Sequence, residues 1–254
     1  MFERVSIIRV ATWNLNTWIN RSKKKISNSQ LWQWAHQHLA ADLVIFTEAA
    51  TPPPTNAVTD WSVAHRPGGF PKVSGWGTVV AGRNLRVERI TNFGDYELDT
   101  NFPGSLTAAD VWREDHLIAT VVGLYLPYRK NKARDFVGHP SQDLRRLKND
   151  FELIYTHRKG PFIVAGDLND EHHVIPAPLS ELGASGTRLV DPFAGLSPKT
   201  FEQDWLSRRQ FTLDYLYLSE SLAGRVVSKL GGITDFPTAF TISDHAPLLV
   251  EAQI

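Results

Sequence analysis

The 254-residue chain is long enough for one large α/β domain, and its 42% hydrophobic content can fill a substantial core. Its 27 basic and 27 acidic residues balance, which argues against a protein that only coats nucleic acid, because such proteins carry a basic surplus. The absence of cysteine excludes disulfides, thiolate zinc sites and cysteine nucleophiles.

The N-terminal part of the chain predicts a strand and no targeting segment. The apolar run at residues 5–10 is interrupted by Ser6 and Arg9 and is too short for a secretory signal. No run of about 20 apolar residues follows, so we expect no membrane span and a cytoplasmic location. No linker divides the sequence, and residues 1–254 are expected to form a single catalytic domain.

Two segments of the chain share one layout of strand, polar loop, helix and strand. The first predicts strands at 6–13 and 42–46 around a helix near 30–39, and the second predicts strands at 116–124 and 162–165 around a helix near 142–157. Residues 27–30 resemble a capping box before the first helix. Further strand-like runs lie at 78–81, 213–218 and 248–252. The short apolar runs "DLVIF" and "PFIVAG" suit strands covered on both sides, which indicates two packed mixed sheets flanked by helices.

Polar side chains follow the predicted strands at the point where each strand ends. Asn14 and Asn16 follow the first strand, Glu48 the second, Tyr125 the third, and Asp167 with Asn169 the fourth. Because ligand sites in α/β sheets gather beyond the carboxyl ends of strands, we expect these acids and amides to share one cleft.

Glu48, Asp167 and Asn169 are the first candidates for chemistry. Glu48 has the carboxylate that a hard cation prefers, although a solvated loop residue or a helix cap would look the same. Asp167 can accept a proton from an attacking water, and Asn169 can hold that water or a phosphate. The alternative for this pair is an Asx-type turn.

Three further candidates lie in the C-terminal part. Strand alternation places Asp214 on one face with Leu216 and Leu218, so Asp214 is expected to be at least half buried and to need a partner; an exposed edge strand is the alternative. Asp244 and His245 are adjacent and point in different directions, so one can bind metal or water while the other faces a phosphoryl oxygen. A surface turn is the alternative for this pair.

The motifs "TWNLN", "DLVIFTE", "GLYLP", "GDLND", "LDYLYLS" and "SDHAPL" occur in an order and spacing that resemble the endonuclease/exonuclease/phosphatase superfamily. That group includes DNase I, exonuclease III-type abasic endonucleases, sphingomyelinases and inositol polyphosphate 5-phosphatases. The resemblance covers residues 8–252. A serine-hydrolase elbow and the Gly-rich fingerprints of Rossmann and P-loop enzymes are absent from the sequence.

The resemblance implies a four-layer α/β sandwich with one active-site cleft and a bound Mg²⁺ or Mn²⁺ ion. It implies that Glu48 is the principal metal ligand with Asn14 beside it, and that Asp244 completes the metal or water shell. It also implies that Asp167 activates water with help from Asn169, and that His245, oriented by Asp214, contacts the phosphate. Tyr125 matches a tyrosine of abasic endonucleases. The resulting list is Asn14, Glu48, Tyr125, Asp167, Asn169, Asp214, Asp244 and His245.

Departures from the family pattern leave the substrate open. Thr47 stands where Gln is frequent, Pro127-Tyr128 replaces "PN", Phe211-Thr212 replaces "WR", and residues 170–173 replace an asparagine-bearing stretch. We therefore expect a divalent-metal-dependent phosphoester hydrolase. The leading candidate is a phosphodiesterase that acts on DNA. The alternatives are an enzyme for small molecules, inositol phosphates or lipid head groups, and an inactive binding module.

Several loops are candidates for substrate contacts. The basic runs 21–25 and 128–132 can touch phosphates, or they can be ordinary solvated loops. Trp18, Trp76 and Trp205 can stack on bases, although packing at the core or rim is the simpler explanation.

Overall fold

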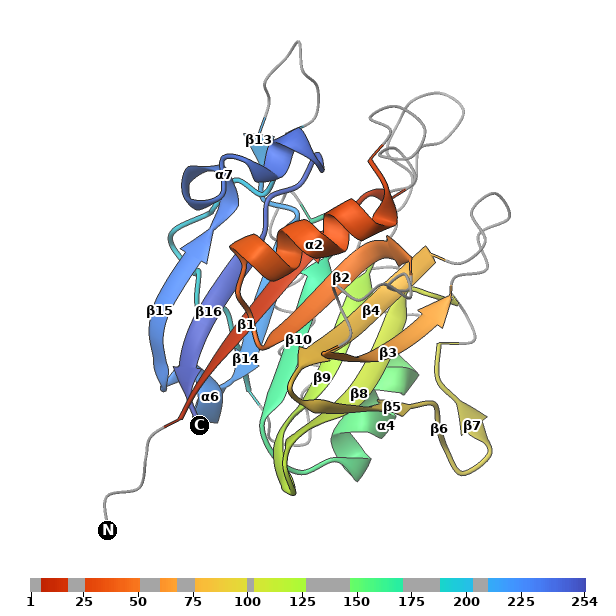
Figure 1. The fold of residues 1–254 in the computed structure, drawn as a ribbon. Helices are drawn as coiled ribbons and strands as arrows, with labels where there is room; N and C mark the ends of the chain where they lie inside the picture. The colour runs from red at the N-terminus through yellow and green to blue at the C-terminus, as the bar shows by residue number, and fades with distance from the viewer. Residues whose placement is uncertain are drawn as a thin grey trace.

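The computed structural model describes residues 6–17, 26–50, 60–67, 76–99, 103–126, 147–170, 188–202 and 210–254. Two six-stranded mixed sheets face each other (Figure 1). The first contains, in spatial order, β15 (Val226–Gly231), β16 (Leu248–Gln253), β1 (Ile7–Asn14), β2 (Leu43–Ala50), β4 (Trp76–Arg83) and β3 (Trp61–Pro67). The second contains β11 (Leu189–Val190), β14 (Asp214–Ser219), β10 (Phe162–Asp167), β9 (His116–Tyr125), β8 (Leu106–Arg113) and β5 (Arg86–Ile90).

Helices cover the outer faces of both sheets. Helix α2 (Asn28–His38) lies over the first sheet and α4 (Lys148–His157) over the second. Short elements complete the described fold: the β6 (Asn92–Phe93)–β7 (Tyr96–Glu97) and β12 (Phe201–Glu202)–β13 (Gln210–Phe211) pairs, α6 (Glu220–Ala223), α7 (Gly232–Asp235) and a 3₁₀ turn at Ala239–Thr241. Separate apolar clusters fill the space between the sheets and beneath each long helix. The four-layer α/β sandwich is therefore confirmed.

The two segments of shared layout form the strands that the sequence predicts. β1 and β2 are parallel neighbours around α2, and β9 and β10 are parallel neighbours around α4. The capping box is present, since Ser27 Oγ accepts from Gln30 N at 3.2 Å and Gln30 Oε1 accepts from Ser27 N at 2.8 Å. The described part of the second helix begins at Lys148, and the earlier part of its predicted range lies outside the described residues.

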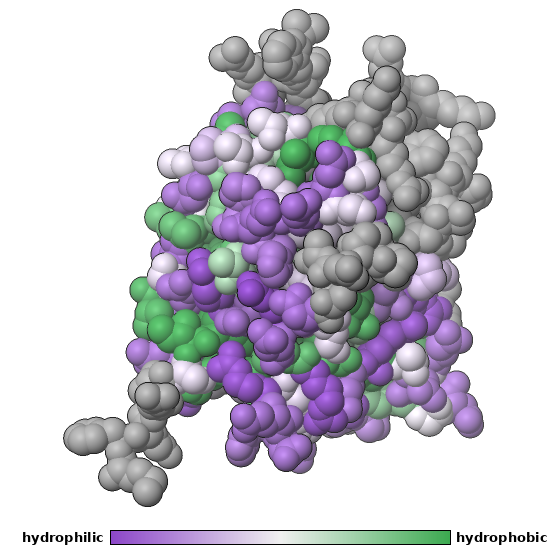
Figure 2. Space-filling model, viewed as in Figure 1, coloured by the Kyte–Doolittle hydropathy of each residue, from purple (hydrophilic) through white to green (hydrophobic). Residues whose placement is uncertain are grey.

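Strands with little continuous apolar character were not predicted from the sequence. β15 shows the clearest case, because its residues are mostly half-buried or exposed along an edge of the first sheet. Val227 and Leu230 are exposed there, and a hydrophobic area lies over β15 at the left of Figure 2. β3, β5 and β8 were also missed, and all of them lie at or next to the other edges of the two sheets.

A buried carboxylate beside β7 gives a testable dependence of stability on pH. Asp99 is 1% exposed, lies 3.3 Å from Arg66 Nε, and accepts from Gly104 N at 2.6 Å. Burial raises the pKa of Asp99 to about 7, and the nearby Asp150 carboxylate adds to the rise. The folded chain thus holds this proton to a higher pH than the unfolded chain. Stability contributed by Asp99 falls as pH rises from about 4 to about 7 and stays low above that.

Asp99→Asn is therefore expected to flatten the pH dependence of unfolding. Asparagine tolerates the positive φ of 59° at this position. Between about pH 5 and about pH 8, the wild type should lose on the order of 2 kcal/mol more than the variant in its free energy of unfolding. Urea denaturation at both pH values measures this, with Asp95→Asn at an exposed position as the control. Equal losses in the wild type and Asp99→Asn would contradict the prediction.

Candidate active site

The ends of β1, β2, β9 and β10, the start of β14 and the turn before β16 bring the predicted site residues together. Within the first sheet, Asn14 at the end of β1 pairs in register with Thr47 next to Glu48. Within the second sheet, Asp167 pairs in register with both Tyr125 and Asp214. The amide of Asn14 links the sheets, because its Nδ2 donates to Glu48 Oε1 at 3.1 Å and to Asp167 Oδ2 at 2.8 Å.

A β-bulge aims Glu48 into the site. The register between β2 and β4 shifts between Phe46 and Ala49, and Glu48 has a φ of 47° there. Burial raises the pKa of Glu48 and the Asp244 carboxylate adds to this, while Asn14 and His245 oppose it. The main reason for the raised pKa is therefore the burial of the Glu48 carboxylate, and the Asp244 charge is a smaller contribution.

The orientation of Asn14 is determined by its backbone neighbour. Asn14 Oδ1 accepts from Asn16 N at 2.8 Å, and because a backbone N–H can only donate, the amide nitrogen must face Glu48 and Asp167. In this arrangement Asn14 donates to both carboxylates and presents its oxygen to the backbone. It can therefore orient the Glu48 carboxylate.

Asp167 occupies a rigid strand end. The preceding Gly166 has a φ of 145°, and a Cβ there would lie 1.9 Å from the carbonyl oxygen of Leu124, so only glycine fits. Asp167 Oδ1 accepts from Asn169 N at 2.9 Å, which is the Asx-type turn, and it coexists with a place in the site. Asn169 Nδ2 donates to Leu126 O at 2.8 Å. Burial raises the pKa of Asp167 to about 8, and the Asp214 carboxylate contributes.

His245 and Asp214 form a buried pair. His245 Nδ1 donates to Asp214 Oδ2 at 2.7 Å, while His245 Nε2 lies 4.0 Å from Asp167 Oδ2. Asp214 is fully buried, as its strand alternation predicts. Burial alone would lower the pKa of His245, but the Asp214 charge and hydrogen bond outweigh it and raise that pKa to about 10. The imidazole is therefore cationic at neutral pH, with its Nε2–H on the side of Asp167.

Asn16 holds Asp244, a contact that sequence reasoning did not assign. Asn16 Nδ2 donates to both carboxylate oxygens of Asp244, at 2.8 and 2.7 Å. Tyr125 hydrogen-bonds the Glu48 carboxylate, and burial together with that charge raises the pKa of Tyr125 well above 10. The Tyr125 hydroxyl thus stays protonated and can donate.

The donor set fits a hard divalent cation. Glu48, Asp167, Asp214 and Asp244 supply four carboxylates against one imidazolium, so a cation would relieve their repulsion. Among the described residues, no three His, Asp or Glu side chains converge as a metal-holding group. Mg²⁺ is usually held by one or two carboxylates and several waters, whereas a structural zinc site needs a closed set of protein ligands.

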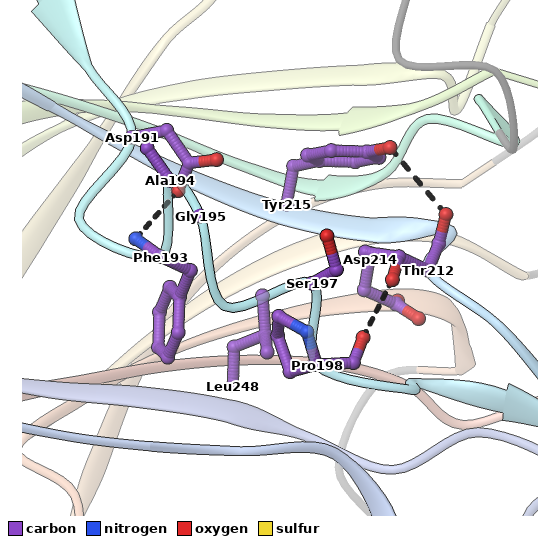
Figure 3. Close-up of a pocket in the computed structure, with 10 residues that line it drawn as sticks. All are labelled: Asp191, Phe193, Ala194, Gly195, Ser197, Pro198, Thr212, Asp214, Tyr215 and Leu248. Atoms are coloured by element: carbon purple, nitrogen blue, oxygen red, sulfur yellow. Dashed lines mark hydrogen bonds between the residues drawn. The ribbon is translucent and has the colours of Figure 1, made fainter.

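A separate cavity borders Asp214. It has a volume of about 230 Å³ and is bounded by the 191–198 turn, β14 and Leu248 (Figure 3). Glu48, Asp167 and His245 do not line it. The cavity and the cluster of site residues therefore meet only at Asp214.

Several predicted contacts lie outside the described residues. These are the basic runs 21–25 and 128–132 and the side chains of Trp18 and Trp205. Trp76 begins β4, and its side chain is likewise not described. Across the described ranges, the structure has no helix long and apolar enough to cross a membrane.

Comparison with known proteins identifies the fold. No family model and no curated protein matches the sequence. Solved structures do match. An AP endonuclease from Archaeoglobus fulgidus is 17% identical with a TM-score of 0.65, over 96% of this chain and 98% of that one. An AP endonuclease from Leishmania major is 18% identical with a TM-score of 0.65, over 100% and 92%.

A third match is an endonuclease/exonuclease/phosphatase protein from Beutenbergia cavernae DSM 12333, 16% identical with a TM-score of 0.60, over 98% of this chain and 72% of that one. The chain has the DNase I-like fold. The fold that the short motifs imply is thus confirmed along almost the whole sequence. In this DNase I-like fold, the strand ends described above form one cluster of acids, amides and a histidine.

Proposed function

We propose that this protein is a divalent-metal-dependent phosphodiesterase that cleaves DNA. The observation that carries the proposal is the buried His245–Asp214 pair, whose free imidazole edge faces Asp167. A cationic donor beside a carboxylate suits a reaction in which water attacks an anionic phosphate.

Mg²⁺ is the ion that fits the site best, with Mn²⁺ as a substitute. We propose that Glu48 and Asp244 hold it together with water, while Asn14 orients Glu48. When bound, the ion would neutralise phosphate charge and stabilise the leaving oxygen.

The protein side chains would supply the remaining steps. Asp167 would orient and deprotonate the attacking water, and Asn169 would act through Asp167, whose carboxylate its backbone N–H already holds. His245 would donate from Nε2 to a phosphoryl oxygen as negative charge develops there. Asp214 would keep His245 cationic and correctly turned. Tyr125, next to Glu48, would donate its hydroxyl to the phosphate.

Features beside the reacting groups favour a nucleic-acid substrate. The ring of Phe201 lies 4.8 Å from that of His245, and Phe211 lies 6.4 Å from Phe201, with both residues half-buried. Aromatic faces in such a position can pack against a deoxyribose or a base. Two of the matching structures are AP endonucleases, which makes an abasic site in DNA the first substrate to examine. Small phosphorylated molecules and lipid head groups are the second candidate.

Cleavage of an end-labelled duplex with one abasic site tests the proposal, with an intact duplex as the second substrate. We expect Mg²⁺-dependent cutting by the wild type, and a loss of about 10²- to 10⁴-fold in His245→Ala. The ratio of abasic to intact cutting distinguishes an abasic endonuclease from a general nuclease.

Failure of the wild type to cut either duplex would overturn the DNA assignment in favour of small molecules or lipid head groups. Cutting by His245→Ala at a near-wild-type rate would instead contradict the proposed chemistry. The two outcomes are separable, because the first concerns the substrate and the second the role of one side chain.

A further inference from the structure

Thr200 connects the two halves of the His245–Asp214 pair, and no motif in the sequence points to it. The residue lies directly before β12 and is fully buried. Its hydroxyl oxygen accepts from Leu213 N at 3.0 Å and from Asp214 N at 3.1 Å. One side-chain oxygen therefore satisfies two buried backbone donors where the Asp214 strand begins.

The backbone of the same residue holds the histidine. Thr200 O accepts from Ala246 N at 2.7 Å, and the next residue, Phe201, forms an antiparallel bridge with His245. The aromatic ring of Phe201 also packs against the imidazole. The segment 200–201 thus contacts Asp214 through a side chain and His245 through the main chain.

This link matters because the two partners come from different sheets. Asp214 begins β14 in the second sheet, and His245 precedes β16 in the first. A small slip of one sheet past the other would lengthen the 2.7 Å contact between His245 Nδ1 and Asp214 Oδ2. Charge-assisted hydrogen bonds are short, and a misplacement of about 1 Å at a reacting group can cost about 10²-fold in rate.

We propose that Thr200 is a positioning residue that holds Asp214 against His245. The proposal rests on the proposed function, in which His245 acts on the phosphate. Thr200 itself touches neither substrate nor metal, and its effect passes through the Asp214–His245 hydrogen bond.

Matched variants separate this role from general packing. Thr200→Val keeps the shape and removes the hydroxyl, whereas Thr200→Ser keeps the hydroxyl and removes the methyl. Thr212→Val is the control, because the Thr212 hydroxyl is also buried and donates to Pro198 O at 2.7 Å without contacting the pair. Thr200→Ala serves as a second variant if Thr200→Val does not fold, since the smaller side chain leaves room for water at the two amides.

The first measurement is the proton NMR signal of the His245 Nδ1–H in ¹⁵N-histidine-labelled protein, identified by its loss in His245→Asn. We expect this deshielded signal to vanish or shift upfield in Thr200→Val and to persist in Thr200→Ser and Thr212→Val. In the cleavage assay, kcat should fall about 10- to 100-fold in Thr200→Val with KM little changed. Thr200→Ser should recover most of that kcat.

An unchanged signal and kcat in Thr200→Val would overturn the proposal. Equal losses in Thr200→Val and Thr212→Val would also overturn it, because they would reflect a general weakening of the region. If the wild type cleaves no DNA, the proposed function fails, but the signal still decides whether Thr200 holds the pair.

Discussion

Asp167→Asn is expected to lower kcat by about 10²- to 10⁴-fold, while KM changes little. The substitution keeps the size of the side chain and one oxygen, which can still accept from Asn169 N as Asp167 does at 2.9 Å. It removes the basic oxygen that lies 4.0 Å from His245 Nε2, where water and phosphate would meet, and that accepts from Asn14 Nδ2 at 2.8 Å. Steady-state kinetics on the cleaved duplex, at several Mg²⁺ concentrations, provides the measurement.

Asp42→Asn is the matched control for this loss. Asp42 also accepts a backbone N–H, from Arg9 at 2.8 Å, but it lies before β2, at the end of that strand away from Glu48. The Asp42→Asn enzyme should cleave DNA at the wild-type rate. A kcat of Asp167→Asn within a few-fold of the wild type would remove Asp167 from the chemistry and leave metal and His245 as the main contributors.

Glu48→Gln is expected to raise the Mg²⁺ concentration for half-maximal cleavage by about 10- to 100-fold. Glutamine can keep the contacts that Glu48 makes with Asn14 and Tyr125, but it lacks the negative charge that a hard cation prefers. A high Mg²⁺ concentration should restore part of the activity, because the substitution weakens binding of the ion and leaves the His245–Asp214 pair in place. Titration calorimetry with Mg²⁺ measures the same loss without substrate.

Glu251→Gln is the control for the metal prediction. Glu251 lies in β16 and pairs with Arg9 at 3.1 Å, away from the site. Its variant should bind Mg²⁺ as the wild type does. An unaltered calorimetric titration in Glu48→Gln would place the ion on other ligands, of which Asp244 is the nearest candidate.

Local patterns in the sequence account for the central strands and for both long helices. Continuous apolar runs at 43–46 and 162–165 mark β2 and β10, which are buried on both faces. β2 pairs in parallel with β1 around α2, and β10 pairs in parallel with β9 around α4. The capping box at Ser27 and Gln30 marks the start of α2, because it needs only residues one turn apart. Edge strands such as β15 could not be recognised, because an exposed strand carries little hydrophobic pattern.

The sequence by itself therefore determined which acids, amides and histidine could meet, since each lies at the end of a recognisable strand or next to one. Only the tertiary structure decided how they meet. The contacts of Asn16 with Asp244 and of Thr200 with Asp214 and Ala246 join segments far apart in the chain. The direction of the Asn14 amide likewise depends on how its neighbours are placed. Such hydrogen bonds leave no local periodicity, because they depend on how strand ends and loops are brought together in space.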